Sequence, residues 1–157
     1  MRDSLVQALN KVGARKRERV ALRWRDSRWT YGALLDAIAG TRNALAKRRC
    51  GPATRVALLI RNCPQYVAVF YGALDAGYAV VPLNTQERAS TLARQIEHSG
   101  ARLVIGDAQH PEWETLHAAI RHLDAEAIGL EITDAQDAPT KLPQALGDDG
   151  TVAAPSA

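Results

Sequence analysis

Four short apolar segments recur along the middle of the chain, each separated from the next by a segment of helical periodicity. The apolar segments are residues 55–60, 78–83, 102–106 and 127–132. Nearly continuous apolar runs of this length are typical of strands covered on both faces. Strands that alternate with helices need crossover connections, which favour parallel pairing. The pattern therefore predicts an α/β fold: an open, mostly parallel sheet with helices on both faces.

The three intervening segments predict amphipathic helices with recognisable ends. The first opens with Pro64 and stops at Gly77, the second stops at Gly100, and the third begins near Pro111. Proline suits the first position of a helix, and glycine suits the position after its end. Apolar residues recur at helical spacing in each: Val67, Phe70, Tyr71 and Leu74; Ala89, Leu92, Ala93 and Ile96; Trp113, Leu116, Ile120 and Leu123.

An N-terminal helix and a β-hairpin are expected before the sheet. Residues 3–12 place apolar side chains at helical spacing, and residues 18–31 form two strand-like runs around a turn at 25–28. Thr30 is suited to cap a further helix. The inward positions of that helix are Leu34, Ile38, Thr41 and Leu45.

The composition changes after Ile132. Residues 133–157 hold three of the seven prolines and four acidic residues, without sustained periodicity. Such a segment is typical of a linker or mobile tail. We therefore expect an α/β subdomain over residues 1–132 and a linker or tail over residues 133–157.

Composition and targeting signals indicate a cytoplasmic protein. Of the side chains, 46% are hydrophobic and 24% charged, which is ordinary for a globular domain. Cys50 and Cys63 lack CxxC spacing, which favours free thiols in a reducing compartment. No apolar run approaches the roughly 18 residues that span a bilayer, and the first residues do not resemble a signal peptide.

The charge is distributed unevenly between the two parts of the sequence. Residues 1–61 carry a net charge of +11 and residues 62–157 a net charge of −8. A basic segment of this kind is compatible with nucleic-acid binding, which would weaken steeply with salt. Its Lys and Arg residues have no interleaved aromatic side chains. A solvated face that attracts the acidic part is therefore the preferred interpretation.

The common catalytic and nucleotide-binding motifs are missing from the sequence. It contains no GxGxxG, no Gly-Lys pair and no GxSxG. His117 and His122 are five residues apart, which places them on different sides of a helix. The acidic pair Glu112 and Glu114 lies in the first turn of the predicted third helix, where carboxylates interact favourably with the helix dipole. We therefore assign no catalytic residue and no metal ligand.

Three stretches of the sequence resemble the AMP-forming adenylate synthetases, which include acyl-CoA synthetases, peptide-synthetase adenylation domains and luciferases. The stretches are residues 29–46, 55–84 and 87–107. The residues that match the family's first two core motifs, together with the Asn-Cys-Pro turn, are Trp29, Thr30, Tyr31 and Leu34; Leu74, Ala76, Gly77, Val81, Pro82, Leu83 and Asn84; and Asn62, Cys63 and Pro64. The resemblance covers about residues 15–107 and implies the N-terminal part of such an enzyme.

The resemblance implies that ATP, Mg²⁺ and coenzyme A serve the parent enzyme, while this chain holds no cofactor itself. The family's phosphate loop, ribose-binding acidic residue and C-terminal lysine are absent from the sequence. Some acyl-CoA ligases present a basic residue to coenzyme A two positions after the motif Asn. Here that position is Gln86, and Arg88 lies two residues further on. Arg88 is therefore the candidate coenzyme A contact.

We thus expect a truncated N-terminal scaffold of an ATP-dependent carboxylic acid ligase, with coenzyme A or a carrier thiol as acceptor, which is inactive alone. Its partner is the remainder of the parent enzyme. Apolar helix faces near Phe70 or near Leu92 and Ile96, uncovered by truncation, favour a homo-oligomer. The alternative is a non-enzymatic α/β binding or interaction module. The reading frame beyond codon 157 discriminates between them.

Overall fold

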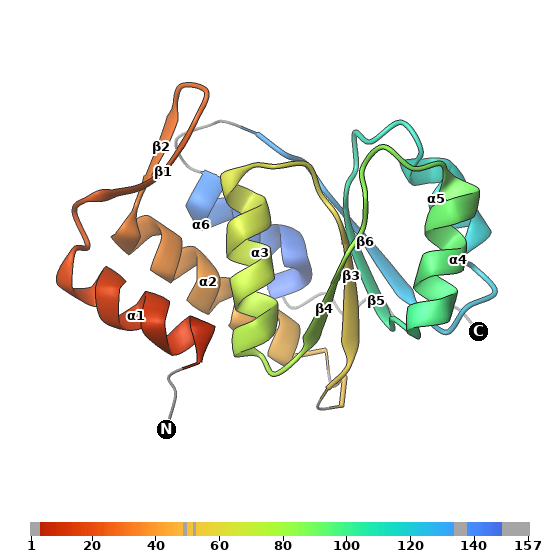
Figure 1. Cartoon of the computed structure of the whole chain (residues 1–157), viewed down its shortest axis with the longest axis horizontal. Helices are drawn as coiled ribbons and strands as arrows, with labels where there is room; N and C mark the ends of the chain where they lie inside the picture. The colour runs from red at the N-terminus through yellow and green to blue at the C-terminus, as the bar shows by residue number, and fades with distance from the viewer. Residues whose placement is uncertain (1–3, 49, 52, 134–137, 149–157) are drawn as a thin grey trace.

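The computed structural model describes residues 4–48, 50–51, 53–133 and 138–148. Its central sheet has the strand order β4-β3-β5-β6, and every neighbouring pair is parallel (Figure 1). The strands are β3 (Arg55–Leu59), β4 (Ala79–Pro82), β5 (Leu103–Asp107) and β6 (Glu126–Leu130). The four predicted strands and their parallel pairing are therefore confirmed.

Helices cover both faces of this sheet, as predicted. On one side lie α2 (Tyr31–Ala46) and α3 (Pro64–Asp75); on the other lie α4 (Ala89–Ser99) and α5 (Trp113–Ala119). Alternate residues of β3 enter the two cores, because successive side chains of a strand point to opposite faces. Val56 and Leu58 join the α2–α3 core, whereas Ala57 and Leu59 join the α4–α5 core.

The N-terminal helix and hairpin lie apart from the parallel sheet (Figure 1). They comprise α1 (Leu5–Arg15), β1 (Val20–Trp24) and β2 (Ser27–Thr30), and the two strands pair antiparallel. The Thr30 side chain accepts a hydrogen bond of 3.1 Å from Ala33 N and so caps α2, as the sequence predicts. Gly100 ends α4 with a φ of 66°, a left-handed conformation that favours glycine.

Small residues bring α2 and α3 into close contact. A Cβ at Gly72 would lie 2.5 Å from Thr41 Cβ, and Thr41 is fully buried. The buried face of α3 also includes Ala68, Val69 and Ala73, whereas the larger residues Val67, Phe70, Tyr71 and Leu74 are half-buried. Helix α3 therefore packs through its small side chains and leaves its bulky stripe partly open. Leu92 and Ile96 are buried against the sheet, so the expectation that they form an exposed face is wrong.

Part of the segment predicted to be a linker or mobile tail is helical. It contains α6 (Ala138–Pro143) and a π-helical turn, η1 (Gln144–Asp148). Leu142 and Leu146 are buried in the α2–α3 core, and a Cβ at Gly40 of α2 would lie 2.3 Å from Pro143 Cγ. Helix α6 and the turn η1 are short, and their sequence lacks the apolar periodicity from which buried helical residues are predicted. Residues 134–137 and 149–157 of this segment lie outside the described residues.

Two further expectations concern the cysteines and the membrane. Cys50 and Cys63 are free thiols, as predicted. Among the described helices, none combines the length and the apolar character needed to cross a bilayer.

Candidate functional site

The strand order places a reversal of the chain at β3. The crossover through α3 puts β4 on one side of β3, and the crossover through α4 puts β5 on the other side. In open α/β sheets, ligands bind beyond the carboxyl ends of the strands at such a reversal. A pocket of about 300 Å³ lies there, which we call the switch-point pocket. Its lining residues are Ile60, Arg61, Asn62, Tyr66, Leu83, Asn84 and Thr85.

Arg61 ties together the carboxyl ends of three neighbouring strands. It follows β3, and its guanidinium donates to Asp107 Oδ2 at the end of β5 over 2.7 Å. A second nitrogen donates to the carbonyl of Ile132, after β6, over 3.3 Å. The Asp107 side chain is only 4% exposed, and its other oxygen accepts from Gln109 N over 3.0 Å. Because a buried carboxylate needs a charged partner, Arg61 and Asp107 depend on each other.

Buried polar atoms also surround the start of α3. Gln65 is 3% exposed, and its amide nitrogen donates to the carbonyl of Thr133. Gln65 Oε1 and Arg61 Nε are buried without a hydrogen-bonding partner. Unpartnered buried polar atoms are uncommon in folded proteins. Arg61, which lines the switch-point pocket, therefore lies near a second buried polar side chain, Gln65, at the start of α3.

Cys63 serves the fold rather than nucleophilic chemistry. It is the N-cap of α3, and its Sγ accepts a hydrogen bond of 3.4 Å from Tyr66 N. Burial raises the pKa of the Cys63 thiol above its ordinary value, which outweighs the lowering effect of the Tyr66 N–H. A thiol of raised pKa carries little thiolate at neutral pH and is a poor nucleophile.

The opposite wall of the pocket follows β4 and is fixed by two contacts, one within its own loop and one from the residues before α5. Asn84 Oδ1 accepts from Gln86 N over 3.0 Å, which forms an Asx turn. His110 contacts the carbonyl of Thr85 through Nε2 at 2.8 Å, while its Nδ1 accepts from Glu112 N over 3.1 Å. Because Nδ1 accepts the Glu112 N–H, Nε2 is the ring nitrogen that faces the Thr85 carbonyl as donor. This histidine orients a loop instead of serving as a metal ligand.

Arg88 lies at the N-cap of α4, with a side chain that is 84% exposed. It donates to Glu112 Oε1 over 3.0 Å, and the other Glu112 oxygen accepts from Ala89 N over 2.9 Å. The Ala89 N–H and the Arg88 guanidinium hold the Glu112 pKa below its ordinary value. The carboxylate of Glu112, expected to serve the dipole of its own helix, therefore caps the neighbouring helix α4. Arg88 does not line the switch-point pocket.

Several residues of this site were not recognised in the sequence, namely Arg61, Gln65, Asp107, His110 and Glu112 as the α4 cap. A charged or amide residue directly after an apolar strand, as at Arg61 and Asp107, is the one signal that points to the end of a parallel strand. No group of three or more His, Cys, Asp or Glu side chains within the described ranges is arranged to hold a metal ion.

Comparisons with known proteins agree with this architecture. A sequence model of the AMP-binding enzyme family matches residues 9–155, and the chain belongs to that family. It is 29% identical over 126 residues to 4-hydroxybutyrate–CoA ligase 2 of Metallosphaera sedula, covering 80% of this chain and 23% of the relative. It is 34% identical over 119 residues to feruloyl-CoA synthase of an Amycolatopsis species, covering 76% and 24%.

A solved structure shows the same fold. The benzoate CoA ligase of Burkholderia xenovorans LB400 superposes with a TM-score of 0.78 at 20% identity, covering 91% of this chain and 28% of that one. The chain thus spans about a quarter of the length of the curated relatives it matches. It corresponds to an N-terminal portion of such enzymes.

Proposed function

We propose that the chain is the N-terminal scaffold of an ATP-dependent ligase that joins a carboxylic acid to coenzyme A or a carrier thiol, and that it is inactive alone. The observation that carries this proposal is the family match over residues 9–155 in a chain that covers 23% and 24% of two CoA-forming relatives. The acid is activated in this scheme as an acyl-adenylate. The remainder of such an enzyme is the partner of this chain.

Within that enzyme, the switch-point pocket is proposed to form one wall of the ligand cleft. Its position at the strand reversal and its polar lining residues, which include Arg61, Asn62 and Asn84, support this role. ATP and Mg²⁺ are assigned to the remainder, because the sequence has no phosphate loop with which to hold them. Positioned donors and a metal are what stabilise charge in such transfers. The contribution of the described residues is structural: Arg61 and Gln65 fix the strand ends that shape the wall.

Arg88 remains our candidate contact to coenzyme A. Its high exposure and its place on the loop after Asn84 support this assignment. A phosphate group that approaches Arg88 competes with Glu112 for the guanidinium, but the Glu112 cap on Ala89 N leaves the helix start intact during that exchange. The variant Arg88→Gln in the complete enzyme is expected to raise the KM for coenzyme A and leave the KM for ATP unchanged.

Two measurements test the proposed function. Purified residues 1–157 are expected to show no ATP–pyrophosphate exchange above a protein-free control with any of a panel of aliphatic and aromatic carboxylic acids. Sequencing the gene beyond codon 157 is expected to reveal a Gly-, Ser- and Thr-rich phosphate loop in frame. Exchange by the isolated chain contradicts its inactivity. A stop codon at this position instead supports the alternative, a stand-alone α/β interaction module.

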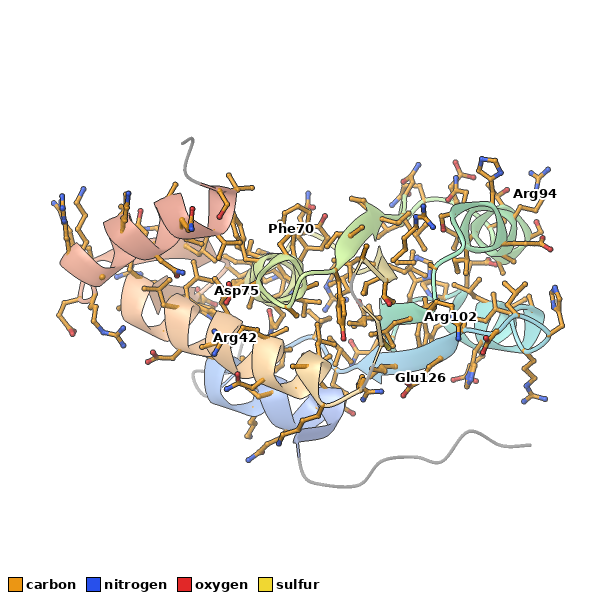
Figure 2. All side chains as sticks on the ribbon, turned by 90° about the horizontal axis from the view of Figure 1, so that it is seen from below. Arg42, Phe70, Asp75, Arg94, Arg102 and Glu126 are labelled. Atoms are coloured by element: carbon orange, nitrogen blue, oxygen red, sulfur yellow. The ribbon has the colours of Figure 1, made fainter. Side chains whose placement is uncertain are left out.

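We further propose that the isolated chain is cytoplasmic and self-associates. The bulky stripe of α3 supports association, because Phe70 stacks with Tyr66 and meets Tyr71 edge-on while all three side chains are half-buried (Figure 2 labels Phe70). Light scattering is expected to give a mass above 17.0 kDa that falls on dilution. A constant monomer mass contradicts self-association.

A further inference from the structure

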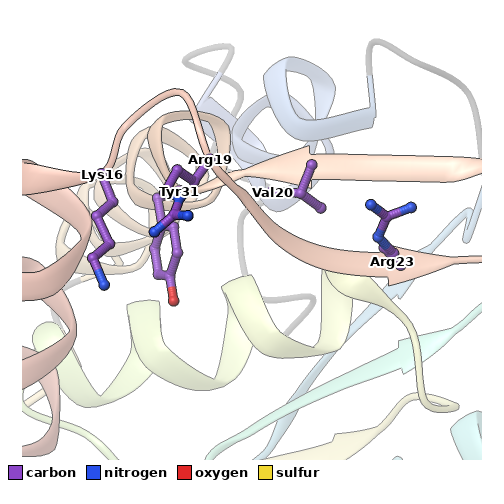
Figure 3. A pocket seen from close by; sticks show the side chains of 5 residues that line it. All are labelled: Lys16, Arg19, Val20, Arg23 and Tyr31. Carbon is purple, nitrogen blue, oxygen red and sulfur yellow. The ribbon is translucent and has the colours of Figure 1, made fainter.

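A second pocket lies where α1 ends, the hairpin begins and α2 starts. Its volume is about 450 Å³, and its lining residues are Lys16, Arg19, Val20, Arg23 and Tyr31. Figure 3 shows the Lys16, Arg19 and Tyr31 side chains gathered on one side, with Val20 and Arg23 further along the hairpin. We call this the hairpin pocket. It shares no lining residue with the switch-point pocket.

The hairpin pocket is strongly cationic and contains no carboxylate. Three of its five lining residues are Lys or Arg, and Tyr31 adds a hydroxyl donor. Within the described part of the chain, no hydrogen bond or ion pair engages the charged groups of Lys16, Arg19 and Arg23. Clustered like charges in a concave site raise the local concentration of anions. The pocket therefore offers several cationic donors to one ligand.

Two neighbouring arginines outside the hairpin pocket have partners within the protein. Arg17 donates to both oxygens of Asp36 at 3.0 Å. Arg25 lies over the Trp24 ring, 4.7 Å from its centroid. Arg17 and Arg25, which do not line the pocket, thus interact with an acidic and an aromatic side chain. The arginines that line the pocket keep their donors available.

The backbone holds this arrangement in place. Arg19 N donates to Lys16 O over 2.9 Å, which brings the two cationic side chains to one side of a turn. The first turn of α2 then fixes that loop, because Tyr31 N donates to Arg19 O over 2.9 Å and Gly32 N donates to Arg17 O over 2.8 Å. The positive end of the α2 dipole also points toward this region. The backbone beneath Lys16 and Arg19 is therefore ordered before a ligand binds.

We propose that the hairpin pocket binds the phosphate groups of a small phosphorylated ligand. Guanidinium groups match phosphate oxygens in pairs, and an ammonium adds a point charge. The volume of about 450 Å³ fits a small ligand. A nucleic-acid surface would instead extend along a groove and use aromatic stacking. This inference is independent of the proposed ligase function.

The test uses the full chain and inorganic pyrophosphate as the probe, followed by calorimetry at low salt. Lys16→Gln and Arg19→Gln are each expected to weaken binding about tenfold, since a hydrogen bond to a charged group contributes that much. Arg94→Gln is the matched control, because this exposed arginine lies on α4, at the opposite end of the molecule from α1 (Figure 2). It removes the same charge and is expected to leave the affinity unchanged. Circular dichroism establishes that each variant is folded.

Three results would overturn the proposal. The first is no measurable binding of pyrophosphate by the folded wild-type chain. The second is equal loss of affinity in Arg94→Gln and Arg19→Gln, which indicates a general charge effect. The third is tighter binding of a short duplex DNA through Lys16 and Arg19, which identifies the surface as a nucleic-acid site.

Discussion

Trp113 packs across two glycines on neighbouring strands, and this contact gives a quantitative prediction. Gly106 of β5 and Gly129 of β6 are register partners. A Cβ added at Gly106 would lie 2.1 Å from Trp113 Cζ3 and 2.6 Å from Cε3, whereas ordinary contacts begin near 3.4 Å. The variant Gly106→Ala therefore forces the indole to move by about 1 Å within a packed interior.

The expected cost follows from where Trp113 lies. The residue is 5% exposed and shares the α4–α5 core with Leu116 and Ile120, which are 0% and 1% exposed. Overpacking such a core costs about 1–3 kcal/mol. Alanine regains about 0.5–1 kcal/mol over glycine through backbone entropy. We expect the free energy of unfolding to fall by about 1–2 kcal/mol.

A double-mutant cycle assigns this loss to the indole. Urea unfolding is followed by far-UV circular dichroism for wild type, Gly106→Ala, Trp113→Leu and the double variant. In the Trp113→Leu background, Gly106→Ala is expected to be neutral or stabilising, which gives a coupling energy of about 1–3 kcal/mol. Gly51→Ala is the control, since its Cβ would meet no atom within 4 Å. An equal loss from Gly106→Ala in both backgrounds would refute this explanation.

Four further predictions concern stability. Thr41 is buried with an unpartnered hydroxyl, so Thr41→Val is expected to raise the free energy of unfolding, measured in urea, by about 1 kcal/mol. Thr30→Val removes the cap of α2 and is expected to lower the free energy of unfolding by about 1 kcal/mol. The raised pKa of Cys63 stabilises the fold below the ordinary thiol pKa, and this contribution disappears as pH rises through the pKa of the folded state. Between pH of about 7 and 10, the Cys63→Ser variant is therefore expected to lose less stability than the wild-type chain. The lowered pKa of Glu112 stabilises the fold above the ordinary carboxyl pKa of about 4.3, and this contribution disappears as pH falls through the folded value. Unfolding of Glu112→Gln is expected to depend less on acid pH, and equal acid sensitivity would contradict the cap.

Most of the fold could be predicted from local patterns. The apolar runs located all four parallel strands, and Thr30 and Gly100 marked helix ends correctly. Such features depend on residues close together in the sequence, so periodicity and capping preferences reveal them. The packed face of α3 was harder, because small residues such as Gly72 carry little hydrophobic signal and acquire their role only when α2 lies against them.

The site depended on contacts that no local pattern contains. Arg61 and Asp107 are 46 residues apart, and Gln65 and Thr133 are 68 residues apart. These pairs meet because the strand order places β5 beside β3 and β6 beyond it. The alternation of strands and helices predicts parallel pairing but leaves the order of the strands open. The polar contacts at the strand ends could therefore not be predicted from the sequence alone.

The cap that Glu112 supplies to α4 has a consequence for the order in which the chain matures during synthesis. The carboxylate lies 23 residues after the Ala89 N–H that it satisfies. At translation speeds of about 5–20 residues per second, that N–H waits about 1–5 s for its partner to be synthesised. Helices α2 and α3 contain their own caps and can form earlier, because Thr30 and Cys63 accept from residues three positions ahead. Helix α4 thus gains its N-terminal cap only after the start of the next helix has been synthesised.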